Sequence, residues 1–199
     1  MLGFLTAIRG NFIADSYRGR LPAGARVLDL GSGSGIVAAI LRDRLGWDVT
    51  CADVAPRLER DLPFVPVPAA GALPFPDLSF DAVMLNDVLH HVEDQAGLLA
   101  RALRAARTVL IFEVEPAGRL LSWFDRAINR LHYGGLPAPE TYRSADDWRG
   151  FLAERGLAGR VETVGRPHFW YPFRHIVITL EHVQEGPAHQ SADRQLHPR

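Results

Sequence analysis

Residues 27–35 of the chain read VLDLGSGSG. This stretch opens with a short apolar run, which is typical of a strand buried on both faces of a parallel sheet. Three glycines at alternate positions then end the strand. The apolar residues that follow recur at the spacing of one helix face; they are Val37, Ile40, Leu41 and Leu45. The pattern predicts a strand, a glycine turn and a helix, so that backbone can approach a ligand and the helix N-terminus offers free N–H groups.

Two ligand classes use such a turn, and the spacing of the glycines separates them. Dinucleotide-binding proteins carry G-x-G-x-x-G, in which the third glycine allows close packing of helix on strand. Here the glycines are Gly31, Gly33 and Gly35, and Ile36 stands where the third glycine of that fingerprint belongs. The sequence DLGSG, with Asp29 ahead of the glycines, instead resembles motif I of the class I S-adenosylmethionine (SAM)-dependent methyltransferases. A glycine turn that binds no ligand is the alternative that this stretch leaves open.

An acidic residue follows at a suitable distance. Residues 48–53 (DVTCAD) predict a second strand that ends at Asp53. An acid about 20 residues beyond the glycines can accept hydrogen bonds from both ribose hydroxyls of a nucleoside. An aspartate that caps the next helix is the alternative. Because dinucleotide-binding enzymes carry an acid at the same position, Asp53 is stronger evidence for the fold class than for the identity of the cofactor.

The most specific signal is residues 72–92, ALPFPDLSFDAVMLNDVLHHV. They are similar to a pattern of small-molecule methyltransferases, L-P-F-x-D-x-S-F-D followed by a strand and V-L-H-H-V. Residues 80–85 predict a buried strand, whose carboxyl end faces the ligand crevice of an open α/β sheet. The family usually carries an aspartate for the adenine amino group four residues before the leucine of L-P-F. This chain has Ala69 at that position.

The resemblance covers about residues 20–180. It implies a Rossmann-like α/β fold, with a seven-stranded, mostly parallel sheet, an antiparallel last strand and helices on both faces. It also implies that SAM is the cofactor and S-adenosylhomocysteine the product. The positions that we assign to the cofactor are Asp29, Gly31, Ser32, Gly33, Gly35, Val54, Asp53, Ala70, Gly71 and Asn86. The resemblance implies that Asp29 binds the amine of SAM directly or through water, that Asp53 binds the ribose and that the backbone of Asn86 meets the methionine end. The backbone of Ala70, Gly71 or Ala72 can meet the adenine edge.

No catalytic residue stands out, because alignment at near-attack distance can carry much of the acceleration of a methyl transfer. The candidates for a base or a substrate contact are His90, His91 and Tyr142. The resemblance places both histidines at the start of a helix near the pocket, and a histidine satisfied inside the fold is the alternative. Glu113 and Glu115 lie at the end of a later predicted strand, where they bind a substrate amine or are solvated.

The length suits a single domain, which we expect over residues 1–183. Its first part, residues 1–19, predicts an N-terminal helix. In the family that the chain resembles, such a helix often lies across the cofactor pocket. Arg9, Tyr17 and Arg18 are therefore candidate contacts.

Several later segments complete the expected domain. Apolar spacing up to Ala106 predicts a helix that covers the sheet, and residues 161–164 and 175–180 predict two closing strands. We expect a helical lid or insert over 117–143, whose amphipathic part also fits a dimer face, a lipid-interface helix or plain packing. The oligomeric state stays open. Residues 184–199 have almost no apolar content and predict a disordered tail.

Composition narrows the class of partner. A formal net charge of -1 argues against a nucleic-acid partner, and no run approaches the ~18 apolar residues of a membrane span. The single cysteine, Cys51, fits a reducing compartment, so we expect a cytoplasmic protein without stable membrane insertion. The eight histidines lack metal-ligand spacing, so we expect no metal. We expect a small-molecule acceptor, aromatic or hydrophobic, because aromatic residues cluster at 123–124 and 169–171.

Rival functions remain at this point. An NAD(P)-dependent reductase shares the acid at Asp53, but the chain has no lysine and therefore no Tyr-x-x-x-Lys pair. A non-catalytic SAM-binding or partner protein would keep the glycine turn and have a collapsed acceptor pocket. A nucleic-acid methyltransferase would need a basic channel or a motif such as N-P-P-Y, and the sequence has neither.

Overall fold

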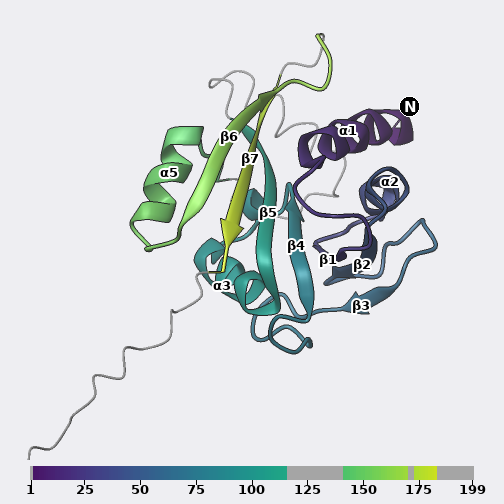
Figure 1. The fold of residues 1–199 in the computed structure, drawn as a ribbon, viewed down its shortest axis with the longest axis horizontal. Coiled ribbons are helices and arrows are strands. Elements are labelled where there is room, and N and C mark those ends of the chain that lie inside the picture. The colour runs from purple at the N-terminus through teal and green to yellow at the C-terminus, as the bar shows by residue number, and fades with distance from the viewer. Residues whose placement is uncertain (1, 116–140, 170–172, 183–199) are drawn as a thin grey trace, which may run out of the picture.

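The computed structural model describes residues 2–115, 141–169 and 173–182 (Figure 1). Its strands are β1 (Arg26–Leu30), β2 (Asp48–Asp53), β3 (Phe64–Pro66), β4 (Phe80–Asn86), β5 (Ala106–Glu115), β6 (Gly159–Gly165) and β7 (Arg174–Glu181). The helices of the described segments are α1 (Leu2–Tyr17), α2 (Ile36–Leu45), α3 (Gln95–Ala105) and α5 (Ala145–Ala153), with a single 3₁₀ turn, η1 (Leu89–His91). The expected lid over 117–143 lies outside these segments up to residue 140, as does the expected tail over 184–199.

The strands form one sheet in the order β3-β2-β1-β4-β5-β7-β6. Strands β1 to β5 pair in parallel, with Leu28 opposite both Thr50 of β2 and Val83 of β4. The last strand, β7, runs antiparallel between β5 and β6. The predicted fold class is therefore confirmed. The proline-bearing β3 lies at the edge of the sheet, where a missing N–H donor is tolerated.

Helices cover both faces of this sheet. One apolar cluster includes Ile13 of α1 and Leu41 of α2, and a second includes Leu99 of α3 and Trp148 of α5. Neighbouring residues of β1 alternate between the two clusters, so the central strands are buried on both faces. Figure 1 shows α1 beside α2 and α5 beside β6. Each fully buried leucine in these layers contributes ~1.5–3 kcal/mol to folding.

Local sequence explains where the helices begin and end. Gly46 adopts a left-handed conformation (φ 70°) after α2, and its N–H donates to the carbonyl of Arg42. Ser144 and Asp147 form a reciprocal capping box at the start of α5, as the S-x-x-D spacing predicts. The prediction that the earlier helix continues to Ala106 was wrong. Ala106 is extended (φ -144°, ψ 160°) and begins β5, because it pairs with Phe80 at the start of β4.

The carboxyl ends of the parallel strands lie along the same side of the sheet. The glycine turn follows β1 there, and Asp53 is the last residue of β2. Strand β4 ends at Asn86, and Glu113 lies near the end of β5. None of the helices in the described segments is both long and apolar enough to cross a membrane.

Candidate active site

The glycine turn after β1 has the backbone geometry that only glycine adopts without strain. Gly31, Gly33 and Gly35 have φ values of 87°, 54° and 71°. A Cβ on Gly31 would lie 2.6 Å from Cγ2 of Val88, and one on Gly35 would lie 2.5 Å from Cδ2 of Leu58. A Cβ on Gly33 would meet no atom within 4 Å. The turn is therefore tightly packed at its two ends and open at its middle.

Backbone hydrogen bonds hold this turn against β2. The N–H groups of Gly31 and Ser32 donate to the carbonyl of Ala52 at 2.7 and 3.1 Å, and Gly35 donates to Ser32 at 3.0 Å. The helix α2 then starts without a side-chain cap. Its first N–H groups carry the positive end of the helix dipole, which favours an anionic group of a ligand.

Asp53 is brought directly to the glycine turn. Its Oδ2 accepts a hydrogen bond from the N–H of Gly33 at 2.8 Å, and its Oδ1 accepts one from Ala55 at 3.3 Å. An ionised carboxylate has about four acceptor positions, so these two bonds leave capacity for further donors. Val54, the next residue, is 61% exposed and presents an apolar surface beside this acid.

Asp29 is buried behind the turn. It is 2% exposed, and the side-chain amide of Asn86 donates to its Oδ1 at 3.3 Å. Burial raises the pKa of Asp29 to about 7, with a smaller increase from the charge of Asp53, while the hydrogen bond from Asn86 lowers it. The Tyr17 hydroxyl donates to Oδ1 of Asn86 at 2.9 Å. A chain of hydrogen bonds therefore joins α1, β4 and β1.

The N-terminal helix places its three candidate contacts differently. Tyr17 is fully buried and bonds to Asn86, whereas Arg18 is exposed and pairs with Asp15. Arg9 forms an ion pair with Asp87, the residue that follows β4. Asp87 has a positive φ of 53°, which is uncommon for a residue other than glycine.

The loop assigned to the adenine is exposed and has a support that the sequence did not reveal. Gly71 has a φ of 92°, and a Cβ added to it would meet no atom within 4 Å. Arg101 of α3 donates to the carbonyls of Gly71 at 3.1 Å and Ala69 at 3.3 Å. No sequence pattern links an arginine to a loop 30 residues earlier, so sequence reasoning missed Arg101.

The candidate catalytic residues meet beside the ends of β4 and β5. The ring centroids of His90 and His91 lie 3.9 Å apart, and Tyr142 stacks on His90 at 4.8 Å with an interplanar angle of 22°. The two histidines form only the η1 turn, because the Asp94 side chain caps α3 and that helix starts at Gln95. The expectation that they begin a longer helix was therefore wrong.

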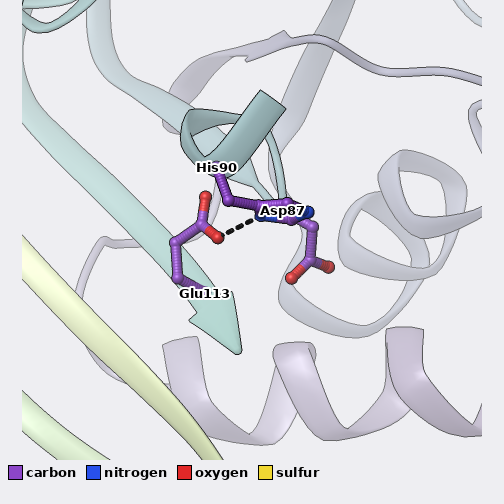
Figure 2. A group of neighbouring side chains, drawn as sticks. All are labelled: Asp87, His90 and Glu113. Carbon is purple, nitrogen blue, oxygen red and sulfur yellow. Dashed lines mark hydrogen bonds and ion pairs between the residues drawn. The ribbon is translucent and has the colours of Figure 1, made fainter. Parts of the chain in front are cut away.

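Glu113 is the partner of His90, and the sequence did not identify it as such. Its Oε2 lies 2.5 Å from Nδ1 of His90, and its Oε1 accepts a hydrogen bond from the N–H of Leu89 at 2.8 Å. Figure 2 shows the two side chains turned toward each other, Glu113 from β5 and His90 from η1. They are 2% and 4% exposed. A solvated Glu113, one of the two alternatives at the sequence level, is thereby excluded.

The same corner contains one group of potential metal ligands among the described residues. Ligand atoms of Asp87, His90 and Glu113 lie within 4.8 Å of one another (Figure 2). The spacing of the histidines in the sequence gave no sign of this group, because Asp87 and His90 come from the segment after β4 and Glu113 comes from β5. Each of them already has a protein partner, since Arg9 pairs with Asp87 and Glu113 binds His90. The absence of a metal stays a prediction.

This arrangement defines a class of protein. A mostly parallel sheet with a glycine turn after β1 and an acid at the end of β2 that bonds to this turn is typical of Rossmann-like domains that bind a nucleoside cofactor. The methyltransferase domain family matches residues 9–161, more than half of the 199 residues. The chain belongs to this family, and the resemblance to class I SAM-dependent methyltransferases is confirmed.

Curated relatives and solved structures agree with this family. The chain is 34% identical over 157 residues to a ubiquinone biosynthesis O-methyltransferase of Methylocella silvestris, covering 72% of this chain and 59% of the relative. It is 30% identical to a 2-methyl-6-phytyl-1,4-hydroquinone methyltransferase of Synechocystis, covering 73% and 47%. The chain thus spans about half to three fifths of the length of these relatives. A possible histamine N-methyltransferase of Thermotoga maritima shares the fold, with a TM-score of 0.65, 17% identity and coverage of 90% and 93%.

We expect the contact between Gly31 and Val88 to appear as an energetic coupling. Gly31→Ala should lower the free energy of unfolding by about 2–4 kcal/mol, because it combines a left-handed alanine with overpacking against Val88. In urea denaturation, Val88→Ala should recover on the order of 1 kcal/mol in the Gly31→Ala background. The control is Gly24→Ala, which has a similar φ of 79° and open space, and should lose only the backbone part. Additive effects of the first two substitutions would contradict the contact.

We expect Asp29 to make stability depend on pH. Its pKa in the folded protein is about 7 and lies above its unfolded value, so the folded state binds the additional proton. The free energy of unfolding should therefore fall as the pH rises from about 4 to 7. Asp29→Asn should remove this component and be more stable than wild type at pH 8, on the order of 1–3 kcal/mol, and similar to it at pH 4. Urea denaturation at both pH values tests this, with the exposed Asp43→Asn as control. An equal difference at both pH values would exclude Asp29 as the titrating group.

Proposed function

We propose that this protein transfers a methyl group from SAM to a small acceptor with an aromatic, hydroquinone-like ring, releasing S-adenosylhomocysteine. The observation that carries the proposal is the hydrogen bond between Asp53 and Gly33, which joins the acid of β2 to the open middle of the glycine turn. This occurs in a chain of the methyltransferase domain family. Several curated relatives carry names that refer to quinones or hydroquinones, and these names support the proposed ring class.

The residues present fit the cofactor. Open space over Gly33 lets a ligand approach the backbone, and the acceptor capacity of Asp53 suits the two ribose hydroxyls. Asp29 lies behind the turn and serves the amine of the methionine end, while Asn86 orients its carboxylate. The exposed backbone of Gly71, supported by Arg101, is positioned for the adenine edge. Bound SAM supplies an electrophilic methyl group on a sulfonium.

The acceptor belongs beside the carboxyl ends of β4 and β5. The ring of Tyr142, which is partly exposed, stacks on the buried ring of His90 there and offers a flat surface to an aromatic ligand. The buried polar pair of His90 and Glu113 lies at the same point and supplies the polar groups that orient a ring hydroxyl. This corner therefore suits a ring with hydroxyl groups better than an aliphatic chain.

We expect S-adenosylhomocysteine to raise the melting temperature of the protein and NADH to leave it unchanged. Asp53→Ala should weaken S-adenosylhomocysteine binding in calorimetry by about 1–3 kcal/mol, because a charged acceptor of the ribose is lost. Asp48→Ala, at the exposed opposite end of the same strand, is the matched control and should bind as wild type does. Unchanged binding in Asp53→Ala would remove the ribose assignment. Stabilisation by NADH in place of S-adenosylhomocysteine would favour the reductase.

A further inference from the structure

We propose that His90 is the general base that removes the proton of the acceptor hydroxyl and that Glu113 is its positioning residue. This inference rests on the methyl transfer proposed above and adds the chemical class of the acceptor, an ionisable aromatic hydroxyl. The observation behind it is a buried carboxylate with both oxygens committed to one turn of the chain, Oε1 to the Leu89 N–H and Oε2 to Nδ1 of His90.

The contact between Oε2 of Glu113 and Nδ1 determines which nitrogen of His90 is basic. A carboxylate that faces Nδ1 at 2.5 Å holds a proton on that nitrogen, so the lone pair of the neutral imidazole lies on Nε2. The same negative charge stabilises the imidazolium that forms when Nε2 takes a second proton. Glu113 thus plays the part of the aspartate in a Ser-His-Asp triad, which orients its histidine.

The turn that carries His90 is held on several sides. The Gln95 side chain donates to the carbonyl of Leu89 at 2.7 Å, and the Thr141 N–H donates to the carbonyl of His90 at 3.1 Å. Tyr142 stacks on the imidazole ring. A base must be placed within hydrogen-bond reach of the proton that it removes, and this fixation serves that requirement.

The pair also lies next to the cofactor turn. Val88, two residues before His90, packs against Gly31, so that one loop joins the glycine turn to the base. The N–H of Asp87 donates to the carbonyl of Phe112 at 2.8 Å, which fixes the other side of this loop to β5. An acceptor ring bound beside His90 therefore lies on the same loop that packs against the turn proposed to bind the methyl donor.

The step balances in atoms and charge. The acceptor O–H bond breaks and its proton moves to Nε2 of His90. The resulting phenolate oxygen forms a bond to the methyl carbon while the methyl–sulfur bond breaks and its electron pair stays on sulfur. The positive charge of the sulfonium is lost, and His90 returns its extra proton to solvent. A phenolic hydroxyl with a pKa near ~10 is mostly un-ionised at neutral pH, so a base accelerates its reaction.

A divalent cation held by Asp87, His90 and Glu113 is the competing role for this group. The structure favours proton transfer because Arg9 already supplies the positive charge beside Asp87. Both carboxylate oxygens of Glu113 already have partners, because Oε1 accepts from the Leu89 N–H and Oε2 contacts Nδ1 of His90.

The test compares wild type with His90→Asn and Glu113→Gln, using catechol as the acceptor and mass spectrometry to follow its methylated product. Asparagine keeps an N–H donor for Glu113 and removes only the basic nitrogen. We expect His90→Asn to lower kcat by about 10²–10⁴-fold and to abolish the rise of kcat with pH. Glu113→Gln should lower kcat, leave KM nearly unchanged and alter the pH profile. Melting temperatures and S-adenosylhomocysteine binding should stay near wild type.

The matched controls are His182→Asn and Glu154→Gln. His182 is an exposed histidine beyond β7, and Glu154 is an exposed glutamate at the end of α5 that pairs with Arg155. Both controls should retain wild-type kcat. His91→Asn distinguishes the role of His91 from that of His90. A loss of kcat in His91→Asn, with kcat unchanged in His90→Asn, would overturn the assignment.

A second readout does not need turnover. In the full chain with ¹⁵N-labelled histidine and bound S-adenosylhomocysteine, the imidazole signal missing from His90→Asn should show a protonated Nδ1 and an unprotonated Nε2 at pH 8. A proton on Nε2 would overturn the proposal, as would wild-type kcat in His90→Asn or no methylation of catechol by wild type. Loss of activity in chelator with recovery on adding Mg²⁺ would assign the group to a metal. A wild type that fails to bind S-adenosylhomocysteine would instead refute the proposed function itself.

Discussion

Val88 lies against the backbone of Gly31 at the point where the order of the strands reverses. Strands β2 and β3 extend the sheet on one side of β1, and β4 and β5 extend it on the other. A crevice opens above such a reversal, and ligands of open α/β sheets bind there. Since a side chain at Gly31 would overlap Val88, the glycine keeps the loop after β4 close to the end of β1. The proposed cofactor turn and the pair of His90 and Glu113 are adjacent for this reason.

Features that short stretches of sequence encode were predicted well. The glycine turn, the end of the second strand at Asp53, and the capping box of Ser144 and Asp147 each follow from a few neighbouring residues and their backbone preferences. The end of α3 was placed one residue too late, because pairing of Ala106 with β4 overrides the helical spacing of apolar residues.

Contacts between distant residues were the part that the sequence could not supply. Glu113 and His90 are separated by 23 positions, and Arg101 supports a loop 30 positions before it. Tyr17 reaches Asn86 across 69 positions. Each pair depends on the register of the sheet and the placement of helices on it. The types of residue and their spacing in the sequence do not predict which distant residues they contact. They can still identify single residues as candidates for the functional site.

The hydrogen bonds that join Tyr17, Asn86 and Asp29 couple ligand binding at the proposed cofactor site to the position of α1. The outermost of these residues belongs to α1, and the innermost is the acid proposed to bind the charged end of the cofactor. Any change in the protonation or bonding of Asp29 alters the amide that Tyr17 holds, and with it the free energy by which α1 is anchored to the sheet. Thermodynamic reciprocity then requires that firmer anchoring of α1 strengthens ligand binding by the same factor. Helix α1 is thereby energetically coupled to the proposed cofactor site through Asn86, which lies 69 positions after Tyr17 in the sequence.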